Sequence, residues 1–304
     1  ARPHRRGPSD SVTGAPGDQG RSLGLLNTMR LGLFQGCLGC LAVIFAGLLN
    51  RIMLSELAFP GLLVGGALAF EQFVAPSRVL FGQMSDAHPW AGRHRIPYIW
   101  LGTALFCGLA VLSIPLIFHV GRLLEVASQP ELAFGIAALC GLFALYGLAI
   151  SLATTPYLAL VIDRTSEAER PRAVGLIWCL LTVGIVIGAI AISLSLRRLD
   201  GITDPSVLEP VLLGFMARVA LVVLGLTVVA TLGLEPRARA VGPSASGRAR
   251  RDDAITLAQA WTLITSSRQV LVFFSFLVLF TLGLFLQDPV LESYAADVFG
   301  MPIA

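Results

Sequence analysis

The chain has 304 residues, of which 55% are hydrophobic and only 13% are charged. Soluble domains of average composition carry about 25% charged residues, so this composition excludes an ordinary soluble protein and indicates an integral membrane protein. The formal net charge of +3 is too small and too dispersed to predict nucleic-acid binding. All five cysteines fall inside apolar runs, so we interpret them as packing residues rather than disulfides or metal ligands.

The first 29 residues are polar and rich in glycine and proline. A segment with so little apolar content cannot bury enough surface to fold, so we expect residues 1–29 to be a disordered arm. The arm is too polar to be a secretory signal. For its last part, residues 21–30, a short interfacial helix and an unstructured lead-in are equally good interpretations.

Seven apolar stretches follow, and each approaches the roughly 20 residues that a helix needs to cross a bilayer. They predict an all-α, multi-pass membrane protein, because stretches of this length are too long for barrel strands. The predicted organisation is a six-helix bundle over 30–234, an Arg-rich linker over 235–268, and a seventh helix within 269–304. The stretches cover residues 31–49, 58–80, 96–118, 133–160, 173–196, 211–234 and 270–287.

The orientation follows from the arginines, which supply all 22 basic residues. Seventeen lie in the N-terminal arm or in the loops that would share its side of the membrane, and four lie in the opposite loops. Because basic residues gather in cytoplasmic loops, we expect the N-terminus and the 235–268 linker to be cytoplasmic.

A hydrophilic break between the second and third predicted spans, GQMSDAHPWAGRHR, concentrates charge in a short segment. It reads as Gly-x-x-x-Asp (Gly82, Asp86) followed by Gly-Arg-x-Arg (Gly92, Arg93, Arg95). Gly82 would let helix ends approach closely, and Asp86 would accept hydrogen bonds from a neighbouring helix N-terminus. The arginines would anchor the loop and close an ion-pair latch that holds one conformation of a rocking bundle.

A second polar loop, DRTSEAERPRAVG, lies between the fourth and fifth predicted spans on the same side. The two loops together resemble the signature loops of major facilitator superfamily transporters, although the first is longer than usual for that family. Positive-inside topology alone would explain the arginines but not the glycines and aspartates at these offsets. The residues of the second loop that carry the resemblance are Asp163, Arg164, Arg170 and Arg172.

Further segments of the sequence resemble one particular branch of this superfamily. They are RLGLFQ from residue 30, LNRIMLSEL from 49, APSR from 75, RIPYIW from 95 and LFLQDPVLESYAADVFGM from 284. Together they resemble the PucC/LhaA family, the bacteriochlorophyll-delivery branch of the facilitators. Members of this family have about twelve spans, so we expect this chain to represent the N-terminal bundle and the first helix of a second bundle.

The resemblance implies an assembly factor for a light-harvesting antenna complex in the intracytoplasmic photosynthetic membrane of a bacterium. It implies bacteriochlorophyll as a bound or carried pigment, and antenna polypeptides, membrane lipids and the reaction-centre core complex as partners. Glycine-rich stretches at 61–70 and 184–190 would let a flat macrocycle or an antenna helix approach closely.

Three charged residues fall inside predicted spans, where an unpaired charge is costly. Glu71 and Arg78 lie seven residues apart, so on one continuous helix they would share nearly the same face and form a structural pair, directly or through another helix. A contact with a pigment headgroup or a polypeptide is the alternative for Glu71. Arg218 would snorkel to the periplasmic interface or bind a lipid phosphate, and we expect it to be an anchor.

His119 ends the third predicted span, where a neutral imidazole could ligate the magnesium of a pigment, although a solvated side chain is the more common outcome. Because spans one and seven are adjacent in facilitators, the resemblance also implies a polar cluster at their periplasmic ends. Capped and solvated helix ends are the alternative. The members of the cluster would be Asn50, Arg51, Glu56, Asp288 and Glu292.

No nucleophile–base pair, metal-ligand spacing or nucleotide-binding motif is present in the sequence, so we expect a protein that is not an enzyme. Two functions remain: assembly of an antenna complex, and secondary transport of a small solute by a facilitator fold. The family resemblance and the scarcity of carboxylates within the spans favour assembly.

Overall fold

The computed structural model describes residues 24–90, 92–126, 128–196, 204–235, 262 and 265–299. Every regular element in these ranges is a helix, and the one extended feature is an isolated bridge between Trp90 and Arg93. The described part of the protein is therefore all-α, as the sequence predicts. Residues 1–23 of the predicted arm and most of the predicted linker lie outside the described residues. The last residues of the predicted arm are helical, because α1 begins at Leu25 and continues into the first span.

The chain divides into two compact units, at residues 1–238 and 239–304. In the first unit, α1 (Leu25–Val43), two π-helical segments and the short α2 (Leu49–Arg51) form one continuous helical run. The remaining helices are α3 (Gly61–Phe73), α4 (Ser77–Ala87), α5 (Ile96–Val126), α6 (Gln129–Arg164), α7 (Arg170–Leu196) and α8 (Pro205–Thr231). The second unit contains α11 (Arg268–Phe299).

Five helices among the described residues are long and apolar enough to cross a membrane. They correspond to the first, third, fourth, fifth and sixth predicted spans, so the chain is a multi-pass membrane protein. The seventh predicted span, 270–287, falls on a helix whose apolar part, Arg268–Gly283, is shorter than these five helices.

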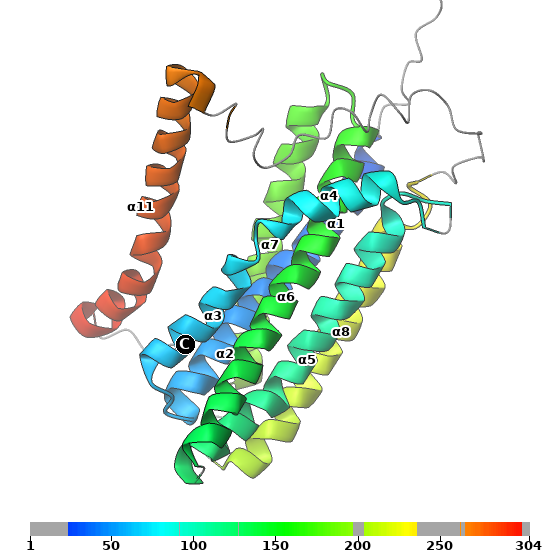
Figure 1. The fold of residues 1–304 in the computed structure, drawn as a ribbon. Helices are drawn as coiled ribbons and strands as arrows, with labels where there is room; N and C mark the ends of the chain where they lie inside the picture. The colour runs from blue at the N-terminus through cyan, green and yellow to red at the C-terminus, as the bar shows by residue number, and fades with distance from the viewer. Residues whose placement is uncertain are drawn as a thin grey trace, which may run out of the picture. The chain divides into compact units, whose positions relative to one another are not determined.

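The prediction that residues 58–80 form a single membrane-spanning helix is wrong. A turn at Val74–Pro76 separates α3 from α4, and the chain changes direction there (Figure 1). Pro76 has no N–H to donate and disfavours helical backbone at Ala75. Across the turn, the N–H groups of Ala75, Ser77 and Arg78 bond to carbonyls three residues back, so the regular helical ladder is interrupted.

The bundle is held together at close helix crossings. α1 packs against α7 and α8, α5 packs against α6 and α8, and α3 and α4 pack against α6. Gly184 of α7 meets the backbone of Gly36 of α1 so closely that a Cβ on Gly184 would overlap the Gly36 carbonyl. Small residues at such crossings let backbones approach and gain dispersion contacts that lipid cannot replace.

This crossing corrects the interpretation of residues 184–190 as an open glycine-rich face. Gly184 and Gly188 are buried against α1, so both serve packing between helices. In the other glycine-rich stretch, by contrast, Gly65 and Gly66 of α3 are exposed, and a Cβ on either would meet open space. The same composition therefore serves internal packing on α7 and a free surface on α3.

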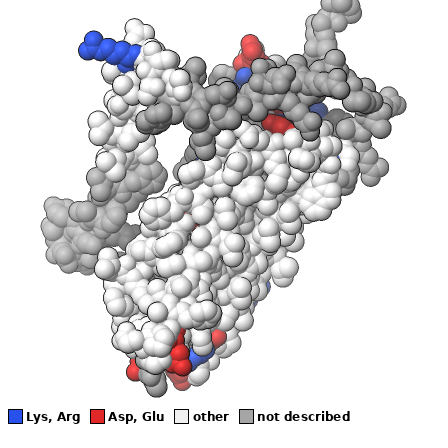
Figure 2. All heavy atoms as spheres, viewed as in Figure 1, with Lys and Arg blue, Asp and Glu red and all other residues white. Residues whose placement is uncertain are grey.

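Aromatic rings fill the centre of the bundle. Phe45 stacks on Tyr146 of α6 with ring centroids 3.7 Å apart, and Phe106 of α5 meets the same tyrosine edge-on. The hydroxyl of the buried Tyr157 donates to the Leu31 carbonyl at 2.8 Å, which ties α6 to α1. On the face drawn in Figure 2, charged side chains gather mostly at the two ends of the bundle and leave the middle apolar.

Candidate functional site

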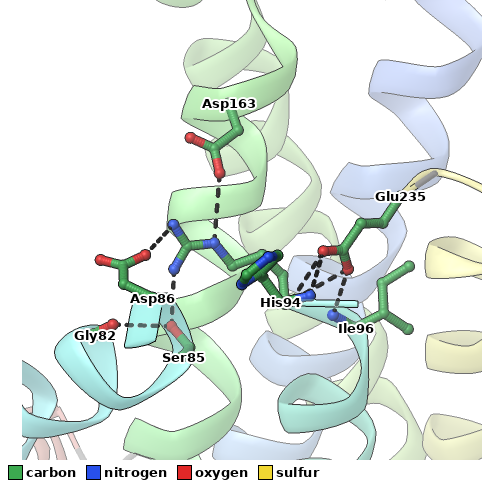
Figure 3. Close-up of polar contacts among 8 residues, drawn as sticks. Gly82, Ser85, Asp86, His94, Ile96, Asp163 and Glu235 are labelled. Atoms are coloured by element: carbon green, nitrogen blue, oxygen red, sulfur yellow. Dashed lines mark hydrogen bonds and ion pairs between the residues drawn. The ribbon is translucent and has the colours of Figure 1, made fainter. Parts of the chain in front are cut away.

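The signature loop is organised around Arg95, whose side chain is only 8% exposed. Its Nη2 lies 2.5 Å from Asp86 Oδ1, and its Nε lies 3.4 Å from Asp163 Oδ2 (Figure 3). Its Nη1 donates to Ser85 Oγ at 2.8 Å. These four residues, Ser85, Asp86, Arg95 and Asp163, are called the Arg95 cluster below. They join α4, the start of α5 and the end of α6.

The two carboxylates of the Arg95 cluster are about half exposed, whereas the guanidinium is shielded. One arginine therefore satisfies two acids that would otherwise repel each other. The Ser85 hydroxyl completes the arrangement by donating to the Gly82 carbonyl at 2.9 Å. The structure thus brings together one residue of the second polar loop, Asp163, and four residues of the first.

The N-terminus of α5 is capped by Glu235, which follows α8 in the sequence. Its carboxylate accepts hydrogen bonds from the backbone N–H groups of His94 at 2.6 Å, Arg95 at 3.1 Å and Ile96 at 2.9 Å (Figure 3). The first N–H groups of a helix have no partner within the helix, and the helix dipole favours an anion there.

This arrangement corrects the role expected for Asp86. The carboxylate that binds a helix N-terminus is that of Glu235, and Asp86 pairs with Arg95 instead. The sequence signal for Glu235 is weak: an acid placed just after a helix end, where Gly233 adopts a positive φ of 78° and turns the chain. No local spacing rule relates position 235 to positions 94–96.

The other residues of the signature loop shape its backbone. Gly92 has a φ of 72°, which a side chain would strain, and it lies in the tight turn closed by the paired backbone bonds of Trp90 and Arg93. The Nε of Arg93 is buried and has no hydrogen-bond partner among the described residues. Arg93 therefore does not take part in the ion-pair latch that the sequence assigned to the arginines together.

In the second polar loop, Arg164, Arg170 and Arg172 make none of the three ion pairs found among the described residues. The Nε of Arg170 is buried and has no hydrogen-bond partner among the described residues.

Further hydrogen bonds join α1 to α8 at this end of the bundle. Arg30 of α1 donates to the carbonyls of Val229 and Leu232 at 2.8 and 2.9 Å. These carbonyls belong to the C-terminal end of α8, which favours a cation.

A direct contact between Glu71 and Arg78 is not among the three ion pairs of the described residues, and the two charges interact at longer range. The turn at Val74–Pro76 removes Arg78 from the continuous helical register on which the prediction depended. Arg78 is exposed on α4, while Glu71 is half-buried on α3, where Gly147 of α6 packs against its backbone.

At the opposite end of the bundle, His119 is exposed on α5. No group of three or more His, Cys, Asp or Glu in the described residues could hold a metal ion. Asn50, Arg51 and Glu56 are each half-buried near the end of the first long helix. The side chains of Asp288 and Glu292, their predicted neighbours, lie outside the described part of the structure.

A large apolar groove runs between α1, α7 and α8, with a volume of about 670 Å³. Its lining on α8 extends from Val211 to Leu226, which is about 22 Å of helix. Arg218 lines the groove and is the single charged residue to do so. Its Nε donates to the Gly214 carbonyl one turn earlier at 3.0 Å.

Arg218 lies thirteen positions from each end of α8 (Pro205–Thr231), or about 20 Å of helix. The expectation that it snorkels to the periplasmic interface or binds a lipid phosphate stays a prediction. Sequence reasoning identified Arg218 as an intramembrane charge but missed the groove, because three helices distant in sequence form it.

Comparison with known proteins gives several similarities that extend over nearly all of this chain. The chain is 31% identical over 284 residues to "Protein PucC" of Rhodovulum sulfidophilum, an alignment that covers 93% of this chain and 60% of that protein. It is 31% identical over 285 residues to an uncharacterized protein in the puhA-bchM intergenic region of Rhodobacter capsulatus, covering 93% and 56%. It is 30% identical over 285 residues to the "Bacteriochlorophyll synthase 44.5 kDa chain" of Rhodobacter capsulatus, covering 92% and 59%.

The chain thus spans a little over half the length of these curated relatives. No solved structure matches it. A family model described as "PUCC protein" matches residues 48–304, which is most of the chain. This match and the identities of about 30% across nearly the whole chain establish that the chain belongs to the PucC family.

Proposed function

We propose that this chain is part of an assembly factor for a bacterial light-harvesting antenna complex, and that it delivers bacteriochlorophyll or holds antenna polypeptides during ring building. Family membership over residues 48–304 is the observation that carries the proposal. The name of one relative refers to bacteriochlorophyll, and the similar proteins come from the genera Rhodobacter, Rhodovulum and Cereibacter.

The proposed protein works within the bacterial inner membrane, in its intracytoplasmic photosynthetic part. The Arg95 cluster and the Glu235 cap lie at the cytoplasmic end in the orientation that we propose, since arginines are most frequent in that set of loops. The facilitator fold is part of the same proposal. It is supported by the packing of α1 on α7 and of α3 on α6, which places helices distant in sequence side by side.

The proposed role is non-enzymatic, with antenna polypeptides, the reaction-centre core complex and membrane lipids as partners. One relative is named as a chain of a synthase, but the two polar clusters described above bind groups of the chain itself. The carboxylates of the Arg95 cluster bind a guanidinium, and Glu235 binds backbone amides. Neither arrangement presents a base beside a nucleophile, which acid–base or covalent catalysis would need.

Deletion of the gene in its photosynthetic host tests this function. We expect antenna absorbance to fall while total bacteriochlorophyll synthesis is largely retained, and an introduced copy of the full gene should restore the absorbance. Normal antenna absorbance combined with altered uptake of a soluble compound would contradict the proposal and favour a secondary transporter. Loss of all bacteriochlorophyll, with its precursors accumulating, would instead indicate an enzyme of pigment synthesis.

A further inference from the structure

The first long helix contains two π-helical segments among the described residues, η1 (Ile44–Leu48) and η2 (Ile52–Glu56), which are separated by α2. In a π segment each N–H bonds to the carbonyl five residues back, so the turn holds one residue more than an α turn. Such segments are rare and occur frequently at functional sites. Each of the two must therefore be held by its surroundings or be free to rearrange.

The first π segment, η1, is held by the core. Ile44 and Phe45 are buried, and the ring of Phe45 stacks on Tyr146. Conversion of η1 to an α turn would rotate the following residues by about 100° and advance them by about 1.5 Å. The half-buried Arg51 would then occupy the place of Ile52, which is 2% exposed. Because burial of a charge is costly, this conversion is opposed.

The second π segment, η2, ends in a strained turn. Ala58 has a φ of 48°, a left-handed conformation that costs a non-glycine residue free energy. The N–H of Leu57 donates to the Ile52 carbonyl at 3.0 Å, and the N–H of Phe59 donates to the Met53 carbonyl at 2.7 Å. In the common helix end with a left-handed residue, the N–H after that residue bonds five residues back, not six. The end of η2 is therefore an ordinary helix end that holds one surplus residue.

Two N–H groups compete for the Met53 carbonyl. In the structure Phe59 holds it, but in an α register the acceptor for Leu57 is the carbonyl four residues back, which is that of Met53. If Leu57 took this carbonyl, Phe59 would lose its bond and the strained turn at Ala58 would be released. Glu56 would then occupy the place of Leu57, and both are half-buried. In contrast to η1, this conversion moves no charge into a fully buried position.

The residues that this conversion moves close the contact between the end of the first long helix and α5. The side chains of Leu57 and Phe59 lie over Gly121 of α5, where a Cβ would come within 3.3 Å of Leu57 and 3.5 Å of Phe59. This contact lies at the end of the bundle opposite the Arg95 cluster. The helix begins at the Arg95 end, where Arg30 joins α8, and it continues for 30 residues, or about 45 Å.

We propose that η2 and the turn at Ala58 form a hinge, in which the Met53 carbonyl passes between the N–H groups of Phe59 and Leu57. With Phe59 as the donor, the end of the helix is closed on α5; with Leu57 as the donor, the end is open. The first π segment and the Arg95 cluster stay fixed, so the bundle moves at one end only. The inference does not depend on the proposed function, because its experiments report on the hydrogen bonds themselves.

Amide hydrogen exchange of the full-length protein in detergent, resolved to single residues, tests the competition for the carbonyl. In the open register Leu57 keeps a hydrogen bond and Phe59 has none. The Phe59 amide should therefore exchange on the order of tenfold faster than the Leu57 amide. Fraying of the whole helix end would free both amides together, so similar exchange rates at Leu57 and Phe59 would overturn the proposal.

Removal of the surplus residue should lock the hinge. Deletion of Leu54, an exposed residue of η2, leaves the Ile52 carbonyl four residues before Leu57, as in an α-helix. The Phe59 amide should then exchange on the order of tenfold more slowly than in the wild type. Deletion of Ala46, an exposed residue of η1, is the matched control and should leave this rate unchanged. A wild-type rate in the Leu54 deletion would overturn the hinge.

Two substitutions test the hinge without a change in chain length. Ala58→Gly relieves the strain of the closed state and should slow Phe59 exchange by on the order of fivefold. Gly121→Leu places a side chain against Leu57 and should speed Phe59 exchange while the Leu57 amide stays protected. Gly108→Leu, on the same helix with open space around its Cβ, should behave like the wild type. Unchanged Phe59 exchange in both test variants, or loss of protection at both amides in Gly121→Leu, would refute the change of register.

Discussion

Two arginines in this protein have opposite surroundings. Arg95 lies at one end of the bundle with a shielded side chain, two carboxylates and a hydroxyl around it. Arg218 lies in the middle of α8, exposed in an apolar groove, and donates a hydrogen bond to a carbonyl of its own helix. The comparison shows that a charge with all its partners inside the fold stabilises the fold, whereas a charge without them costs free energy in an apolar environment.

The same contrast extends to the helices around each arginine. The Arg95 end is fastened by bonds between segments far apart in sequence, including the Glu235 cap and the contacts of Arg30 with the end of α8. The walls of the groove present exposed apolar side chains such as Val222 and Leu226. A change at the Arg95 end should therefore affect stability more than a change on the groove wall.

The largest effect is expected where the groove floor depends on a glycine. Gly184→Ile should separate α7 from α1, because the new Cβ would overlap the Gly36 carbonyl, and we expect a loss of about 3 kcal/mol or more. Thermal melting in detergent measures it. Gly175→Ile on the same helix is the control, since a Cβ there meets open space; equal melting of both variants would refute the close crossing.

Removal of the guanidinium from the Arg95 cluster should come next. Arg95→Leu leaves Asp86 and Asp163 without their shared cation, and we expect a loss of about 2 kcal/mol, less than for a fully buried pair because both acids are half exposed. The melting temperature should fall clearly. Arg172→Leu, at an exposed position of the second polar loop, should melt like the wild type.

A smaller loss is expected at the cap of α5. Glu235→Ala removes a carboxylate that accepts three backbone N–H groups, and loss of a helix cap costs about 1 kcal/mol. Hydrogen exchange of the first turn of α5 should increase. Glu167→Ala, an exposed acid in the second polar loop, provides the comparison, and the same exchange in both variants would show that the cap contributes nothing.

The smallest effect is expected at the opposite end of α8, where Asp204 accepts bonds from the amide and hydroxyl of Ser206. These bonds lower the pKa of Asp204. A lowered pKa in the folded state means that its contribution is present above the unfolded value of about 4 and is lost as the pH falls through the folded value. Asp204→Ala should therefore weaken α8 slightly at neutral pH and remove this acid-dependent part, as melting at pH 7 and pH 3 would show.

The sequence predicted some residues of the Arg95 end correctly and missed others. Arg95 and Asp163 were selected because glycine and aspartate spacing in two polar loops is unusual, and the structure joins them. Arg93 was selected by the same pattern but does not join them. The glycine spacing predicts the backbone turn at Gly92, and it does not predict which of the two arginines points toward the aspartates. Glu235 was missed because its contact with α5 connects positions about 140 residues apart.

By itself, the sequence determined that the protein is all-α and embedded in a membrane, because apolar stretches of bilayer length leave helices as the suitable form. It also determined the family resemblance and the positions of five long spans. Tertiary structure decided which glycines are buried, which acid caps α5, and that Glu71 and Arg78 are separated by a turn at Pro76. The physical reason is that hydropathy and spacing act along one segment, whereas caps, ion pairs and grooves depend on which distant segments the fold brings together.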